Sequence, residues 1–167
     1  VVGTSQDMQF TQFNAAPLYL NPGFTGSTIE HRFASSYRNQ WAGIPGHFVN
    51  YAFAYDYNLA EFNSGLGLLF AREVAGTGNM GNTEIGLLYS YHFQIDKKIF
   101  IQPGIKFNFV TRGLDFSKLV FNDQLSRGGS GTTVDDIQID NVSYMDITAG
   151  FLVYSAKYWA GISLNHM

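Results

Sequence analysis

Strict alternation between apolar and polar side chains, with a period of two residues, constrains the fold of this chain more than any other feature. In residues 49–59 the large apolar or aromatic side chains occupy the odd positions, and the small or polar ones occupy the even positions. Successive side chains of a β-strand point to opposite faces, so this pattern predicts a strand with one apolar and one polar face. About nine to eleven extended residues cross a lipid bilayer at a tilt, and this strand is long enough.

The same pattern predicts seven strands, which account for most of the chain after residue 29. We expect them at residues 30–41, 47–59, 62–73, 82–95, 98–112, 137–154 and 157–166. Charged side chains of these segments fall on the polar face: Arg32, Arg38, Asp56, Glu73, Glu84, Lys98, Lys106, Arg112 and Asp146. Arg72 departs from the pattern but lies near a strand end, where an outward charge costs little free energy in a membrane barrel.

These two faces favour an all-β fold, a transmembrane antiparallel β-barrel, over a soluble one. A soluble sheet would expose its charges and cover its apolar face with a second layer, and the sequence predicts neither a helix nor further strands for that layer. Mean hydropathy is −0.04, as expected when lipid-facing and lumen-facing residues average out. A soluble β-sandwich that acts as a binding module is the alternative fold.

The spacing of the predicted strands indicates how the chain is organised. Residues 1–29 are expected to form an irregular N-terminal arm in the lumen or periplasm, because Pro17 and Pro22 prevent a long regular element. Residues 30–167 carry the strands, and their connections alternate between short and long, the longest at 113–136. Outer-membrane barrels have short periplasmic turns and long external loops, so we expect a periplasmic N-terminus and an external loop at 113–136.

Seven is an unusual number of strands for a membrane barrel. Single-chain bacterial barrels have an even number, and an open edge in lipid would leave backbone groups without hydrogen bonds. We therefore expect the chain to be the N-terminal half of a larger barrel of about 14 strands. Closure by a partner strand or an oligomer is the alternative. The chain starts at Val1 without the features of a signal peptide, which predicts a processed mature start.

No combination of residues predicts an enzyme, a metal site or a cofactor site. The histidines lack the spacing of metal ligands, and the GTGNMG motif at 76–81 precedes a predicted strand instead of the helix that a dinucleotide site requires. His92 with Asp56 or Ser90 is a conceivable catalytic arrangement, and calcium binding by aspartates of the long loop also stays open. The chain has no cysteine, and its net charge of −3 argues against nucleic acid as a partner.

Two groups of residues are candidate functional sites. Side chains on the inner parity are expected to face the lumen, where they could line a pore: Arg32, Arg38, Asp56, Glu84, His92, Lys106, Arg112 and Asp146. Residues of the long loop are candidates for binding a partner or for packing into the lumen: Leu114, Phe116, Leu119, Phe121, Asp123 and Gln124. Apolar residues in exposed loops often mark such surfaces.

A series of short motifs, in this order, resembles the PorP/SprF family of outer-membrane proteins of the type IX secretion system. The motifs are QDMQFTQ at 6–12, NPGFTG at 21–26, YRNQW at 37–41, GLG at 65–67, YSYH at 89–92, GLDF at 113–116 and FNDQ at 121–124. The resemblance extends over the whole chain. Met8 stands where the family pattern has proline. Family members are roughly twice as long, in agreement with the incomplete strand count.

The resemblance implies a non-enzymatic protein in the outer membrane of a Gram-negative bacterium. Family members support the secretion or surface attachment of large adhesins with a C-terminal sorting domain, including gliding adhesins. The expected partners are such a cargo, other type IX secretion components such as peptidoglycan-linked or motor-ring proteins, and outer-membrane lipid. No cofactor or catalytic residue is carried over. A passive pore for small solutes is the alternative function.

Overall fold

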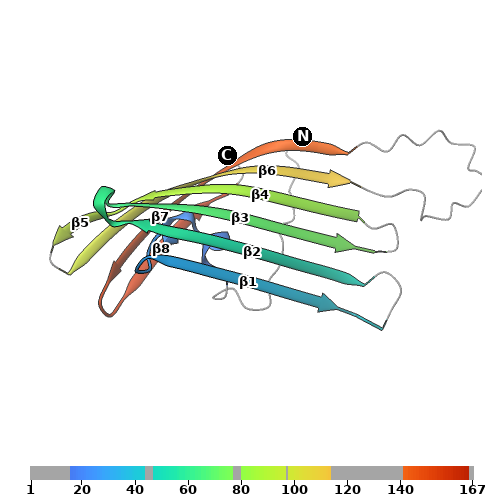
Figure 1. Ribbon diagram of the computed structural model, residues 1–167, viewed down its shortest axis with the longest axis horizontal. Helices are drawn as coiled ribbons and strands as arrows, with labels where there is room; N and C mark the ends of the chain where they lie inside the picture. Colours follow the sequence, from blue (N-terminus) through green and yellow to red (C-terminus); the bar gives the residue numbers. More distant parts are fainter. Residues whose placement is uncertain (1–15, 44–46, 77–79, 97, 114–140, 166–167) are drawn as a thin grey trace, which may run out of the picture.

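The computed structural model describes residues 16–43, 47–76, 80–96, 98–113 and 141–165, and strands make up most of this part of the chain (Figure 1). Two short helical segments come first, α1 (Pro17–Leu20) and η2 (Pro22–Phe24). The strands are β1 (His31–Gln40), β2 (Phe48–Leu59), β3 (Ser64–Ala75), β4 (Met80–Tyr91), β5 (Phe93–Asp96), β6 (Ile99–Gly113), β7 (Val142–Ser155) and β8 (Trp159–Leu164). Among the described residues, no helix is long and apolar enough to cross a membrane.

All strands belong to one curved antiparallel sheet with the order β1-β2-β3-β4-β6-β7-β8. β5 continues in line with β4 and also pairs with β6, so seven strands lie side by side. The sheet forms a half-barrel, and the predicted all-β fold with seven antiparallel strands is confirmed. The larger barrel of about 14 strands stays a prediction.

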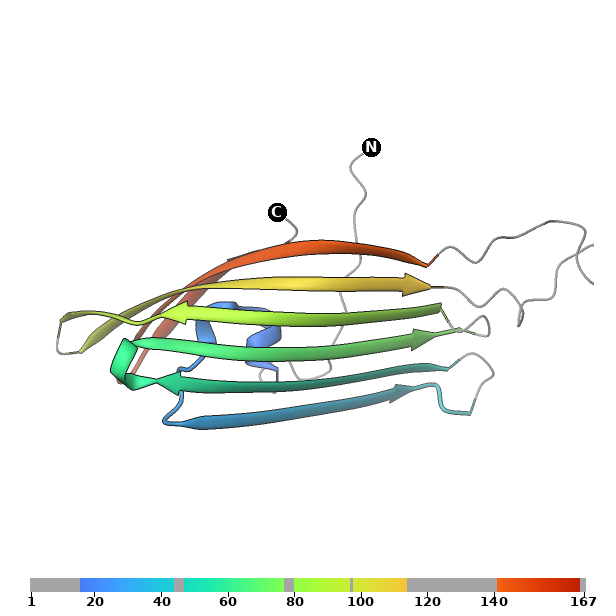
Figure 2. The same cartoon turned by 45° about the horizontal axis from the view of Figure 1, so that its top comes forward.

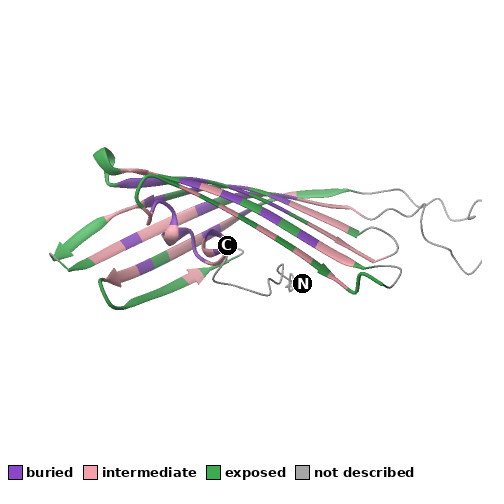
Figure 3. Ribbon diagram, turned by 60° about the horizontal axis from the view of Figure 1, so that its bottom comes forward, coloured by how far each residue is buried: buried purple, intermediate pink, exposed green. Residues whose placement is uncertain are grey.

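The register of the sheet separates two faces, as the alternation predicts. One row of directly paired residues runs along the convex face: Phe33, Tyr55, Leu68, Leu87, Phe107 and Ile147. The next row lies on the concave face: Arg32, Asp56, Gly67, Leu88, Lys106 and Thr148. Figure 3 shows buried and exposed residues alternating along the strands. The convex face is therefore apolar and exposed, and the concave face holds the polar residues.

The concave face is less polar than the alternation predicts. Leu69 and Leu88 on this face are 2% exposed, and they form a buried apolar cluster with Ala54 and with Leu18 of α1. These leucines are buried because α1 and η2 lie on the concave side of the sheet, seen in blue in Figure 2. The sequence pattern places Leu69 and Leu88 on the inner parity but does not identify the segment that covers them.

Several predicted strand boundaries differ from those in the structure by one or two residues. The third strand begins at Ser64 instead of residue 62, because Ala60–Phe62 form a 3-10 turn, η3, that Asn63 ends in the left-handed conformation (φ 47°). The fourth predicted strand is divided at His92 into β4 and β5. The backbone N–H of His92 donates to the carbonyl of Asn63, 2.7 Å away, in register with the β3–β4 pairing. That pairing ends there because η3 and the left-handed Asn63 replace β3 beyond Ser64. Residues 77–79 of the GTGNMG motif lie outside the described residues. The strand β4 begins at Met80, at the end of the motif.

Candidate functional site on the concave face

Residues 16–29, which we call the inner segment, lie against the concave face of the half-barrel (Figure 2). They include α1, η2 and the NPGFTG motif at 21–26. η2 contacts β4, β6 and β7, and Leu18, Pro22 and Thr25 are each no more than 2% exposed. The inner segment is therefore a packed part of the concave face rather than a strap lying over it.

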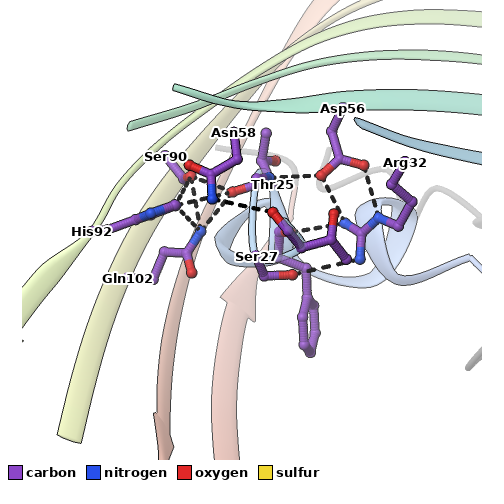
Figure 4. A network of polar contacts seen from close by, with 11 residues as sticks. Thr25, Ser27, Arg32, Asp56, Asn58, Ser90, His92 and Gln102 are labelled. Atoms are coloured by element: carbon purple, nitrogen blue, oxygen red, sulfur yellow. Dashed lines mark hydrogen bonds and ion pairs between the residues drawn. The ribbon is translucent and has the colours of Figure 1, made fainter. Parts of the chain in front are cut away.

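Asp56 on β2 joins the inner segment to β1. Arg32 Nε donates to Asp56 Oδ1 over 2.7 Å, and Arg32 Nη2 donates to Asp56 Oδ2 over 3.0 Å. The same Oδ2 accepts the backbone N–H of Gly26 at 2.7 Å, and Arg32 Nη2 also donates to the carbonyl of Phe24 at 2.8 Å (Figure 4). Asp56 is 0% exposed, and these donors compensate the desolvation of its charge.

The carbonyl oxygen of Thr25 is the second point where the sheet holds the inner segment. Ser90 Oγ donates to it over 2.6 Å, and Gln102 Nε2 donates to it over 2.5 Å (Figure 4). Ser90 lies on β4 and Gln102 on β6, and both side chains are 0% exposed. Two neighbouring strands therefore bind one backbone carbonyl of the inner segment.

Asn21 and Asn58 attach the two ends of the NPGFTG region to the sheet. Asn21 Nδ2 donates to the carbonyls of Phe151 on β7 (3.3 Å) and Ile162 on β8 (3.1 Å). Its Oδ1 accepts the backbone N–H of Gly23 at 2.7 Å. Asn58 Nδ2 on β2 donates to the carbonyl of Thr28 at 3.1 Å. The contacts at Phe24, Thr25, Gly26 and Thr28 reach backbone atoms of the inner segment, whereas Asn21 binds the sheet through its side chain.

Glycines on the inner parity of three strands allow this close approach. A Cβ atom at Gly65 would meet the carbonyl of Thr25, one at Gly104 would meet the carbonyl of Pro22, and one at Gly150 would meet Asn21 Oδ1. Any side chain at these positions would force the inner segment away from the sheet. Glycine inside a strand is a known sign of close backbone approach. This signal is present in the sequence and could have identified the docking surface.

A polar hollow lies beside the inner segment and is lined by residues of β4, β6 and β7. Lys106 Nζ and Glu84 Oε1 are 3.2 Å apart in a buried ion pair, and Lys106 Nζ also lies 5.0 Å from the ring centroid of Tyr19 in α1. Arg112 Cζ lies 5.9 Å from the ring centroid of Tyr144. Asp146, 8% exposed, lines the same hollow.

The structure places the candidate residues for the lumen on the concave side in two groups. Arg32 and Asp56 form one ion pair at the inner segment, with His92 close to Gln102 and Ser90. The second group lines the polar hollow: Glu84, Lys106, Arg112 and Asp146. Arg38 lies apart from both groups and donates to Gln40 Oε1 at 2.8 Å. That these residues face the lumen stays a prediction.

The candidate residues of the long loop all lie outside the described residues: Leu114, Phe116, Leu119, Phe121, Asp123 and Gln124. The aspartates considered for calcium, Asp115, Asp123, Asp135 and Asp136, also lie outside them. Their proposed roles therefore stay predictions. Asn21, Thr25 and Gln102 are not among the candidate site residues predicted from the sequence, but they lie at the centre of the polar network.

The conceivable catalytic arrangement around His92 lacks the required geometry. Ser90 Oγ is 3.5 Å from His92 Nε2 but donates its proton to the carbonyl of Thr25 at 2.6 Å. Asp56 binds Arg32 and Gly26 instead of orienting His92. A serine nucleophile needs a base in hydrogen-bond reach and access to a substrate, and Ser90 is 0% exposed. These contacts serve to hold the inner segment.

The convex face is the second functional surface. Large apolar side chains on every strand remain exposed there, among them Phe33 (68%), Leu87 (59%) and Phe107 (51%). Charged residues are rare on it within the described strands, and Arg72 lies near the end of β3, as predicted. Exposed apolar surface of this extent is rare on soluble monomers and is typical of the lipid-facing band of a membrane barrel.

Comparison with known proteins agrees with this combination of an apolar outer face and a polar inner face. A family model described as "Type IX secretion system membrane protein PorP/SprF" matches residues 2–167, essentially the whole chain. No curated protein and no solved structure gives a match. The chain is therefore a membrane component of the type IX secretion system and belongs to the PorP/SprF family.

Proposed function

We propose that this protein is an outer-membrane barrel that supports the secretion or surface anchoring of a large adhesin with a C-terminal sorting domain, of the gliding type. The observation that carries the proposal is the family match over residues 2–167. The expected partners are the adhesin, other type IX secretion components, which include peptidoglycan-linked or motor-ring proteins, and outer-membrane lipid. No catalytic step is required for this role.

The occupied concave face supports anchoring over a passive pore. A pore for small solutes needs an open polar path along the barrel axis. Here the inner segment is held against β2, β4 and β6 by Asp56, Ser90 and Gln102, all of them buried. We therefore expect planar bilayers that contain the purified full-length protein to show little conductance. A steady open channel would favour the pore.

We further propose that the short turns face the periplasm and that the 114–140 connection faces outward. Figure 1 shows that β3 and β6 end, and β4 and β7 begin, at the same end of the sheet. The turn that contains η3 and the turn between β7 and β8 lie at the other end. The long connection between Gly113 and Val142 supports this orientation, because outer-membrane barrels have short periplasmic turns and longer external loops. The β3–β4 connection, residues 76–79, is as short as the 60–63 turn and does not distinguish the two ends.

Deleting residues 114–134 tests the role of the long connection in cargo binding. We expect surface display of the adhesin to be lost, while the barrel still inserts in the outer membrane and keeps its heat-modifiable migration on gels. The matched control replaces residues 77–79 with Gly-Ser-Gly, which alters the β3–β4 connection at the same end. Normal display after the 114–134 deletion would contradict the proposed cargo contact, and loss of display in both variants would show that the effect is not specific.

A further inference from the structure

The polar hollow beside the inner segment contains buried polar atoms that lack hydrogen-bond partners. Among the described residues, these include Asn82 Oδ1, Asn108 Oδ1 and Thr148 Oγ1. Asn108 is 4% exposed and Thr148 is 0% exposed, and all three residues line the hollow. Buried polar groups are nearly always paired, because an unpaired one loses its bond to water without replacement. The hollow therefore offers these three atoms to a hydrogen-bond partner, either water or a polar ligand.

The charges of the hollow favour an uncharged ligand. Glu84 and Lys106 form an ion pair at 3.2 Å, and the hollow also contains one further cation, Arg112, and one further anion, Asp146. Because the two signs balance, neither an anion nor a cation gains from the local charge. Unpaired amide oxygens instead require donors such as neutral N–H groups, and a hydroxyl both donates and accepts.

A peptide main chain offers this combination of neutral donors and acceptors, and the same concave face already binds one. Asp56 accepts the N–H of Gly26, and Ser90 and Gln102 donate to the carbonyl of Thr25. Those residues are carboxylate, hydroxyl and amide side chains on the inner parity of β2, β4 and β6. Asn82, Asn108 and Thr148 are of the same kind and lie on β4, β6 and β7.

The chain itself supplies a segment of suitable length at the edge of the hollow. Tyr19 lines the hollow, and Ala16, where the described chain begins, is 8% exposed. Fifteen residues precede Ala16, and extended they reach up to about 50 Å. Asp7 is their only charged side chain, and they carry four amide side chains, Gln6, Gln9, Gln12 and Asn14.

We propose that residues 1–15 bind in this hollow, with their main chain paired to Asn82, Asn108 and Thr148. The N-terminal arm would then continue the surface that the inner segment forms and fill the concave face beside β6 and β7. The binding of residues 1–15 in the hollow does not depend on which cargo the protein serves.

Disulfide trapping tests the proposal in the full-length protein in its native membrane. Residues 1–167 contain no cysteine, and any cysteine elsewhere in the protein is first replaced by serine. Thr148→Cys is combined in turn with Ser5→Cys, Gln9→Cys or Gln12→Cys, and mild oxidation is followed by mass spectrometry of the tryptic peptides. We expect at least one pair to form an intramolecular disulfide in most molecules. The control replaces Thr148→Cys by Ser35→Cys on the convex side of β1, where no disulfide is expected.

Accessibility of Cys at position 148 provides a second readout that needs no exact pairing. Removal of residues 1–13 from the Thr148→Cys protein is expected to raise the rate of maleimide labelling at least tenfold, with heat-modifiable migration confirming that the barrel still folds. The proposal is overturned if the labelling rate is unchanged. It is also overturned if the cysteine at 148 forms disulfides only with another protein, which would identify a partner peptide as the occupant.

Discussion

Arg32 and Asp56 face each other on β1 and β2, and their ion pair at 2.7 Å is also a backbone clamp. The carboxylate of Asp56 accepts the N–H of Gly26, and the guanidinium of Arg32 donates to the carbonyl of Phe24. The ion pair thus joins β1 to β2 and also fixes the turn that follows η2. Residues that the strand alternation places on the concave face therefore determine where the inner segment lies.

Asp56→Asn is expected to destabilise the protein by roughly 3 kcal/mol, because it leaves Arg32 without its anion in a buried site. Urea unfolding in lipid vesicles, followed by tryptophan fluorescence, measures this change. Glu61→Gln in the exposed η3 turn is the matched control and should be close to neutral. Equal stability of the Asp56→Asn protein and the control would show that the clamp contributes nothing.

Gly104→Ala is expected to displace the inner segment, because the added Cβ would overlap the carbonyl of Pro22. Overpacking of this kind costs about 1–3 kcal/mol. The ring of Trp159 lies 5.5 Å from that of Phe24, so its fluorescence in a Trp41→Phe background reports on the inner segment. Gly43→Ala, where the added Cβ meets nothing within 4 Å, is the control and should leave the spectrum unchanged. An unchanged spectrum for Gly104→Ala as well would contradict the close contact.

Thr25→Cys with Gly67→Cys is expected to form a disulfide that locks the inner segment to β3. A Cβ at Gly67 would lie 3.1 Å from Thr25 Cγ2, a position that the Sγ atom of a cysteine at 25 can take, so the two sulfur atoms come within bonding reach. The bond is detected by mass spectrometry after mild oxidation in native membranes. Thr25→Cys with Gly43→Cys is the control that should stay reduced. Failure of the first pair to oxidise would show that the inner segment does not rest on β3.

The faces of the sheet could be predicted from the sequence, because a strand's alternation is a local property. Phe53 and Asp56 differ in parity, and the structure exposes the first and buries the second. The odd strand count also followed from the pattern. The break at His92 could not be predicted, because it lies where the neighbouring strand β3 gives way to the η3 turn and the left-handed Asn63.

The docking of the inner segment could not be predicted from alternation alone. Asn21 reaches the carbonyl of Ile162, 141 residues further along the chain, and the two meet only because the sheet curves around η2. Period-two patterns carry no information about curvature or about what fills the concave side. Glycines such as Gly104 and Gly150 do indicate where the concave side is filled, because a glycine inside a strand is a sign of close approach of another backbone.

Leu87→Arg and Met80→Arg together test whether the convex face contacts lipid. The two side chains are equally exposed, at 59% and 57%, but Leu87 lies in the middle part of β4 and Met80 at its beginning. In a bilayer the arginine at 87 is expected to cost about 2–4 kcal/mol and the one at 80 about 0–1 kcal/mol. Urea titration of folding into vesicles measures both. On a soluble sheet two equally exposed positions would tolerate arginine alike, so equal effects would argue against a lipid-facing surface.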